Sequence, residues 1–259
     1  MNLEIPVTRT RISVPHVRND FLSRPRLLDI LDGLLEKKII LVSAPAGYGK
    51  TSLLVDFASR VKIPVCWYAI DQLDQDPLRF ITYLITTIQQ QFPSFGKASF
   101  EALSNSAQVK PDLDYLVSAI VNDAYDHINE HFLIVLDDYH LVDQSDQVNH
   151  FISRFVQDVD ENCHVIFASR TLLSLPDLPL MVARSLAGGL SFEELAFSLP
   201  EIKGLYKLVY QQALDDIKAE QLAAQTEGWI TGLLLTAQNL SADVDIASLS
   251  RRTAGIGLN

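Results

Sequence analysis

Along the chain, short unbroken runs of apolar residues alternate with longer segments in which apolar residues recur every three or four positions. Unbroken apolar runs predict strands buried on both faces of a sheet, and the three-to-four spacing predicts amphipathic helices. The runs that predict strands are Ile39–Val42, Val65–Ile70, Phe132–Leu136 and His164–Ala168. The segments that predict helices are about Thr51–Arg60, one beginning at Asp76-Pro77, Asp112–Asn129 and about Gln147–Gln157. This alternation predicts an α/β fold, a parallel sheet with helices on both faces.

Beyond Pro200 the pattern becomes helical throughout. Helices are predicted at about 200–212, 214–225 and 230–240, and Ser198 with Glu201 has the sequence of a capping box for the first of them. We therefore predict two domains, an α/β domain of residues 1–197 and a small all-helical domain of residues 198–259. Two stretches are predicted to be looser, residues 92–111 and the tail after about residue 241.

The first apolar strand runs directly into a loop with the residue types of a phosphate-binding P-loop. That pattern requires a small residue, four free positions and then Gly-Lys-Ser/Thr. The predicted nucleotide-binding residues are Ala44, Pro45, Ala46, Gly47, Tyr48, Gly49, Lys50, Thr51 and Ser52. The glycines provide backbone without Cβ where the chain curls around phosphates, and successive N–H groups then form an anion site at a helix N-terminus. We predict that the Lys50 ammonium reaches the β- and γ-phosphates and that the Thr51 hydroxyl is a ligand of Mg²⁺.

A second strand supplies the acidic partner of this loop. Asp137 and Asp138 follow five apolar residues, which places them at the carboxyl end of a central strand, where open α/β sheets keep their ligands. Asp137 is the predicted magnesium ligand, and Asp138 is a candidate base that orients or deprotonates the attacking water. The alternatives for Asp138 are a solvated acid or the N-cap of the segment that follows.

Two long helices between the P-loop helix and the acidic strand suggest that another strand separates the two motif strands, as in ATPases of the AAA-like kind. No Asn-Lys-x-Asp motif is present, which argues against GTP. The expected ligands are therefore ATP or ADP with Mg²⁺.

Composition removes several other classes of function. A net charge of −11 argues against a DNA-binding surface on these residues, since nucleic-acid affinity depends largely on Lys and Arg. The six histidines have no metal-ligand spacing, and His140 is interpreted as a capping or packing residue. No apolar run is long enough to span a membrane, the N-terminus does not resemble a signal peptide, and the two cysteines are isolated. A cytoplasmic protein is expected.

These motifs together resemble a known family. The matching stretches are Ser23–Leu28, Leu41–Thr51, Trp67 with Asp71, Leu136–His140, Ala168–Arg170 and Thr226–Leu233. They are similar to the nucleotide-binding module of the large, MalT-like LuxR-type transcription regulators, which belong to the STAND class of signal-transduction ATPases. The likeness runs from about Arg18 to Leu240.

The resemblance implies a switch that holds ADP, exchanges it for ATP when an inducer binds, hydrolyses ATP slowly and self-associates. By analogy, Arg24 would lie against the adenine and ribose, and Arg170 would sense the γ-phosphate. The Gly228-Trp229 corner would fold the helical domain back on the nucleotide. The alternatives are a solvated Arg24, an Arg170 salt bridge to a nearby acid such as Asp137 or Asp138, and a plain core tryptophan with a C-cap glycine.

Family members continue into a sensor and a C-terminal DNA-binding domain, which this sequence lacks, so we expect either a fragment or a stand-alone module. DNA binding would belong to that missing domain.

One competing interpretation is a AAA-like motor or loader ATPase, in which Arg60, Arg154 or Arg184 would act as an arginine finger in the site of a neighbouring subunit. The other is a nucleotide-binding scaffold that no longer hydrolyses, against which the intact Asp137-Asp138 pair argues.

Overall fold

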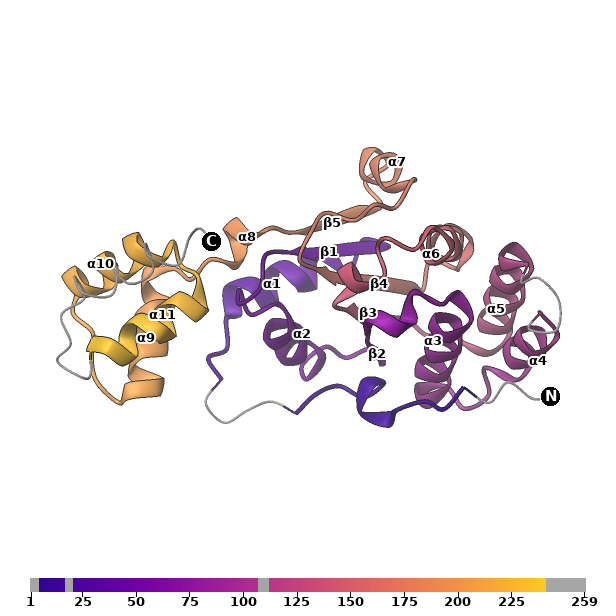
Figure 1. The fold of residues 1–259 in the computed structure, drawn as a ribbon, viewed down its shortest axis with the longest axis horizontal. Coiled ribbons are helices and arrows are strands. Elements are labelled where there is room, and N and C mark those ends of the chain that lie inside the picture. Colours follow the sequence, from indigo (N-terminus) through magenta and orange to yellow (C-terminus); the bar gives the residue numbers. More distant parts are fainter. Residues whose placement is uncertain (1–4, 17–20, 107–111, 241–259) are drawn as a thin grey trace, which may run out of the picture.

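The computed structural model describes residues 5–16, 21–106 and 112–240. Their centre is a five-stranded parallel sheet in the order β2-β3-β4-β1-β5 (Figure 1). The strands are β1 (Ile39–Ser43), β2 (Val65–Ala69), β3 (Phe132–Asp137), β4 (Cys163–Ser169) and β5 (Ala187–Leu190). The predicted separation is confirmed, because β4 pairs with both motif strands, aligning Ile40 with Ile166 on one side and Ile134 with Val165 on the other.

The sheet is covered on both faces, as predicted. Alternate residues of each strand enter different apolar cores, because successive side chains of a strand point to opposite faces. One core receives Cys66, Tyr68, Ile134, Leu136, Val165 and Phe167 together with α3 (Pro77–Gln91), α4 (Lys97–Ser106), α5 (Leu113–His127) and α6 (Asp146–Asp158). The other receives Trp67, Leu133, Val135, Ile166 and Ala168 together with α1 (Pro25–Leu34) and α2 (Lys50–Ala58).

The residues at which the sequence predicts α3 and α5 to begin, Asp76 and Asp112, cap these helices. The Asp76 carboxylate accepts a hydrogen bond from Leu78 N (2.9 Å), and Pro77 occupies the first turn of α3, where a missing N–H costs nothing. The Asp112 side chain caps α5 in the same way, accepting from Tyr115 N at 3.1 Å.

Several elements were not predicted. These are α1, α4, β5, α7 (Leu178–Ala183) and α8 (Phe192–Leu195). The expectation of a loose segment at 92–111 is wrong for α4, because the buried Asp123 carboxylate of α5 accepts hydrogen bonds from Gly96 N, Ser99 N and Ser99 Oγ and so organises its first turn. Residues 107–111 and the tail after residue 240 lie outside the described residues.

The C-terminal helices form a group of their own at the end of the molecule farthest from α4 and α5 (Figure 1). They are α9 (Leu199–Tyr210), α10 (Asp216–Thr226) and α11 (Ile230–Leu240). Phe197, Ile202, Leu205, Leu222 and Leu233 share a third apolar core. The predicted capping box holds, since Ser198 N donates to Glu201 Oε2 at 2.8 Å. None of the described helices is long and apolar enough to cross a membrane.

Candidate functional site

The loop between β1 and α2 has the backbone that its glycines allow. Gly47 and Gly49 both lie in the left-handed region, with φ of 78° and 80°, where a Cβ is disfavoured. Gly49 is also the N-cap of α2, so the first N–H groups of that helix have no helical acceptor. The loop and helix together present backbone donors and the positive end of the helix dipole, which suits an anion such as a phosphate.

The Lys50 side chain folds back into this loop and donates hydrogen bonds to its carbonyl oxygens. This side chain is buried (7% exposed), and Nζ donates to Ala44 O at 2.6 Å and to Pro45 O at 3.1 Å. Burial lowers the pKa of Lys50, and the nearby Asp138 opposes that change. The ammonium therefore lies inside the loop, bonded to carbonyls that a phosphate oxygen could replace as acceptors.

Thr51 and Asp137, from α2 and the end of β3, are brought together. Thr51 Oγ1 lies 3.1 and 3.0 Å from the two Asp137 carboxylate oxygens. Burial and the neighbouring Asp138 raise the pKa of Asp137 to about 6, although the Thr51 hydrogen bond lowers it. A hydroxyl beside a carboxylate is the hard oxygen donor pair that Mg²⁺ takes when phosphates and waters complete its shell. The residues present thus fit a magnesium ion.

Asp138 has a strained backbone and a largely free side chain. Its φ of 60° is uncommon for a residue with a Cβ, and such strain concentrates at functional sites. Asp138 stands at the N-cap position of the short helix that follows, but its side chain, 43% exposed, makes no capping hydrogen bond there. His140 Nδ1 lies 3.8 Å from Asp138 Oδ1, too far for a hydrogen bond. Burial lowers the pKa of His140, and Asp138 opposes this.

Arg170 follows β4 at the same edge of the sheet. It is exposed, and its charge opposes protonation of both Lys50 and His140, so all three lie near one another. Within the described part of the chain, no ion pair joins Arg170 to Asp137 or Asp138, so the predicted salt-bridge alternative is absent there.

Arg24 is buried (4% exposed), which removes the solvated alternative. Its guanidinium donates to Leu195 O (2.8 Å), Ala196 O (2.9 Å) and both Glu201 carboxylate oxygens (3.1 and 3.0 Å). It also lies over the Phe197 ring, 4.0 Å from the centroid. Burial would raise the pKa of Glu201, but the hydrogen bonds from Arg24 and Ser198 N lower it to about 2. Arg24 thus joins α1 to the segment that leads into α9.

A cavity of about 500 Å³ opens beside the start of α2, within the range of small-molecule sites. Gly49, Thr51 and Ser52 border it at the loop, and Arg24 contributes as well. Its other walls come from α2 (Leu53, Val55), from the residues before α1 (Pro15, His16, Phe21, Leu22) and from the helical part (Phe197, Leu205, Val209, Ile230, Leu234). Sequence reasoning missed these apolar walls, because they are adjacent only in the folded chain.

The helical part also touches the loop directly. Trp229 Nε1 donates to Ala46 O at 2.9 Å, and Thr231 donates to Gly47 O from Oγ1 (3.3 Å) and from N (3.4 Å). Gly228, with a φ of 72°, accepts from Phe197 N at 2.9 Å and lets the chain turn at this point. The structure therefore places the Gly228-Trp229 corner against the loop. Thr231 was within the matching stretch but was not predicted as a site residue.

Comparison with known proteins agrees with this geometry. The family model described as Nephrocystin 3, N-terminal, matches residues 17–170. Two curated relatives are the HTH-type transcriptional regulators MalT of Vibrio parahaemolyticus and of Yersinia pestis. The first is 30% identical over 228 residues, which is 88% of this chain and 25% of the relative. The second is 31% identical over 248 residues, 95% of this chain and 27% of the relative.

The chain spans about a quarter of the length of these relatives. Among solved structures, a Walker-type ATPase of Pyrococcus abyssi is similar with a TM-score of 0.58 and 18% identity, over 92% of this chain and 73% of the other. At that identity the likeness shows the fold alone, a P-loop ATPase fold. The likeness to MalT regulators predicted from the motifs is confirmed over most of the chain.

Proposed function

We propose that this chain, which belongs to the Nephrocystin 3 N-terminal family, is the ATP- and ADP-binding switch module of a MalT-like transcription regulator of the STAND class. In this proposal hydrolysis is slow, and the bound nucleotide controls self-association of the whole regulator. DNA binding is assigned to a domain outside this chain. We place the boundary between nucleotide-binding and helical domains at residue 197, where the third core begins.

The roles of the residues follow from their positions. The backbone N–H groups of residues 44–52, other than Pro45, would bind the phosphates, and Lys50 would exchange its carbonyl partners for the β- and γ-phosphate oxygens. Thr51 and Asp137 would hold Mg²⁺, which neutralises phosphate charge when it is bound. The exposed Asp138 carboxylate would orient the attacking water, and the exposed Arg170 would lie against the γ-phosphate.

The observation that carries the proposal is the contact of the helical part with the phosphate-binding loop. Trp229 and Thr231 bond to the carbonyls of Ala46 and Gly47, two residues of the segment that must change its hydrogen bonds when a phosphate enters. A change in this loop therefore moves the carbonyl acceptors to which Trp229 and Thr231, at the start of α11, donate. Such a direct link between ligand and neighbouring domain is what a nucleotide-controlled switch requires.

The first experiment identifies the nucleotide that freshly purified protein releases on denaturation and measures its basal ATPase rate. Tightly held ADP with almost no turnover supports the switch. An empty site with turnover well above roughly 1 s⁻¹ would instead support a motor or loader ATPase. For that second candidate, Arg60, Arg154 and Arg184 are all exposed, and Arg60 and Arg154 are already bonded to Asp56 and Asp158.

Lys50→Ala tests the site itself. Removing the ammonium should weaken ATP and ADP binding by at least an order of magnitude, which corresponds to about 1.4 kcal/mol. The matched control is Lys62→Ala, a lysine in the loop after α2 that lies outside the predicted site. Unchanged nucleotide affinity in the Lys50 variant would show that the assignment of the site is wrong.

A further inference from the structure

The N-terminal segment lies along the outside of the α/β domain and ends at the cavity. Its described residues 5–16 pass the edge strand β2 and helix α3, and continue toward α1 along the lower side of the view in Figure 1. Pro15 and His16 line the same cavity that Gly49, Thr51 and Ser52 border at the phosphate-binding loop. Because the loop would bind the phosphates, we infer that Pro15 and His16 border the part of the site that would take the nucleoside.

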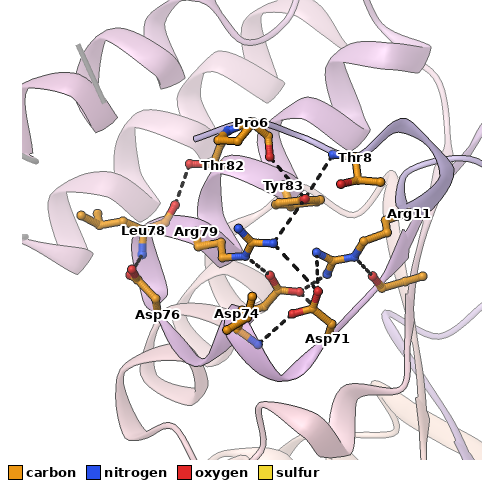
Figure 2. A network of polar contacts seen from close by, with 12 residues as sticks. Pro6, Thr8, Arg11, Asp71, Asp74, Asp76, Leu78, Arg79, Thr82 and Tyr83 are labelled. Atoms are coloured by element: carbon orange, nitrogen blue, oxygen red, sulfur yellow. Dashed lines mark hydrogen bonds and ion pairs between the residues drawn. The ribbon is translucent and has the colours of Figure 1, made fainter. Parts of the chain in front are cut away.

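Arg11 attaches this segment to the domain. Its Nε donates to Ala69 O at 2.9 Å, its Nη1 lies 2.9 Å from Asp71 Oδ2, and its Nη2 donates to Asp74 Oδ2 (Figure 2). The guanidinium also lies over the Tyr83 ring, 4.3 Å from the centroid. Planar, forked donors of this kind fix orientation as well as distance, which a lysine cannot do.

Asp74, which accepts one of the Arg11 hydrogen bonds, is held in place by further hydrogen bonds. The Asp74 side chain is fully buried (0% exposed), accepts from Asp71 N at 2.8 Å and receives a second guanidinium, Arg79 Nε, at 2.9 Å. Figure 2 shows the two arginines on either side of Asp74. Removing Arg11 would leave the buried Asp74 carboxylate with Arg79 as its remaining guanidinium partner among the described residues.

A second attachment lies three residues earlier. Thr8 N donates to Tyr83 Oη at 3.1 Å, and the Tyr83 ring stacks on Tyr68 of β2 with centroids 5.4 Å apart. Ile12, directly after Arg11, is buried in the core. The segment is therefore fixed at residues 8, 11 and 12, and the cavity wall at Pro15 and His16 follows directly after these attachments.

We propose that Arg11 is a positioning residue for nucleoside binding, which it serves by holding residues 12–16 in place as a preformed wall of the cavity. The inference rests on the proposed nucleotide site. Phosphates are bound by another set of groups, residues 44–52 with Thr51 and Asp137, none of which contacts Arg11 in the described structure. Loss of Arg11 therefore weakens the binding of the nucleoside and leaves the binding of phosphates unchanged. An unanchored wall must be ordered anew on binding, which lowers affinity.

The test compares Arg11→Met, which keeps most of the side-chain length, with wild type by calorimetric titration of ADP and, separately, of magnesium pyrophosphate. We expect ADP affinity to fall about tenfold or more while pyrophosphate affinity stays within twofold. Tyr83→Phe is the milder variant: it keeps the ring under Arg11, loses the acceptor for Thr8 N, and should shift ADP affinity in the same direction by a smaller factor.

Arg154→Met is the matched control, because it also removes an ion-paired arginine, one on the exposed side of α6, and it should change neither affinity. Unchanged ADP affinity in a folded Arg11 variant, or equal losses for ADP and pyrophosphate, would overturn the proposal. If Arg11→Met does not fold, the same two readouts on Tyr83→Phe decide. Failure of the proposed function is distinct, since wild-type protein would then bind neither ligand.

Discussion

Gly47 combines two demands on a single residue, one from its own loop and one from another part of the fold. Its φ of 78° disfavours any Cβ, and an added Cβ would lie 2.7 Å from Trp229 Nε1 as well as against the Thr231 side chain. Gly49 has a similar φ of 80°, but an added Cβ there would meet nothing within 4 Å. A comparison of the two glycines therefore distinguishes the effect of backbone strain, which both positions share, from the effect of contact with the helical part, which only Gly47 has.

We therefore predict that Gly47→Ala destabilises the protein more than Gly49→Ala. Both variants should lose about 1–2 kcal/mol from left-handed backbone strain, and only Gly47→Ala should lose the contacts with Trp229 and Thr231 in addition. Urea unfolding without nucleotide measures this difference. Gly33→Ala, in a helix with open space around it, is the control and should be neutral or slightly stabilising. Equal losses at positions 47 and 49 would contradict the prediction.

Glu201 gives a prediction about pH. Its pKa is about 2 in the folded protein and near 4.3 in an unfolded chain, so the unfolded state binds more protons between these values. The stabilisation is fully present above about pH 4.5 and is lost as pH falls toward 2. Its upper limit is roughly 3 kcal/mol, from 1.36 kcal/mol per pKa unit.

The measurement is the difference in unfolding free energy between wild type and Glu201→Gln, taken from pH 6 to pH 3. We expect wild type to be the more stable form at pH 6 and the difference to shrink toward pH 3. A difference that does not depend on pH would show that the carboxylate charge is not what stabilises the Arg24 contact.

At the scale of elements, the sheet could be predicted because each buried strand is a continuous apolar run, and the motifs at β1 and β3 fixed its ligand edge. The strand β5 could not be predicted, because Ala-Gly-Gly-Leu has no apolar pattern. It forms a strand by pairing with β1. Likewise, the first turn of α4 is stabilised by Asp123, which lies 24 positions beyond Ser99. The burial of Arg24 is made possible by its ion pair with Glu201, 177 positions away. Local patterns contain no information about such distant partners.

The dependence of α4 on α5 can be measured. Asp123→Ala would leave Gly96 N, Ser99 N and Ser99 Oγ without their buried acceptor, and we expect a loss of roughly 2–3 kcal/mol in unfolding free energy. Asp126→Ala, on the exposed side of the same helix, should stay within about 0.5 kcal/mol of wild type. Similar effects of the two changes would show that α4 folds without this acceptor.

At the scale of the whole molecule, the two tryptophans lie in contrasting places. Trp229 is bonded to Ala46 O of the loop, whereas Trp67 is buried in β2 with 1% of its surface exposed. If nucleotide rearranges the loop, only Trp229 should change its surroundings. We predict that ADP alters tryptophan emission in wild type and in Trp67→Phe, and that Trp229→Phe abolishes the response. A response retained by Trp229→Phe would contradict the direct contact as the route between the domains.

The position of β4 in the sheet has a consequence for how the protein is made. The strand that leads into the phosphate-binding loop and the strand that carries Asp137 have no hydrogen bonds to each other, and both are held by β4 at residues 163–169. A nascent chain that has emerged only as far as residue 160 contains both motifs but lacks the strand that joins them. Nucleotide affinity should therefore arise late in synthesis and abruptly, once β4 has left the ribosome and can insert between two strands that were translated before it.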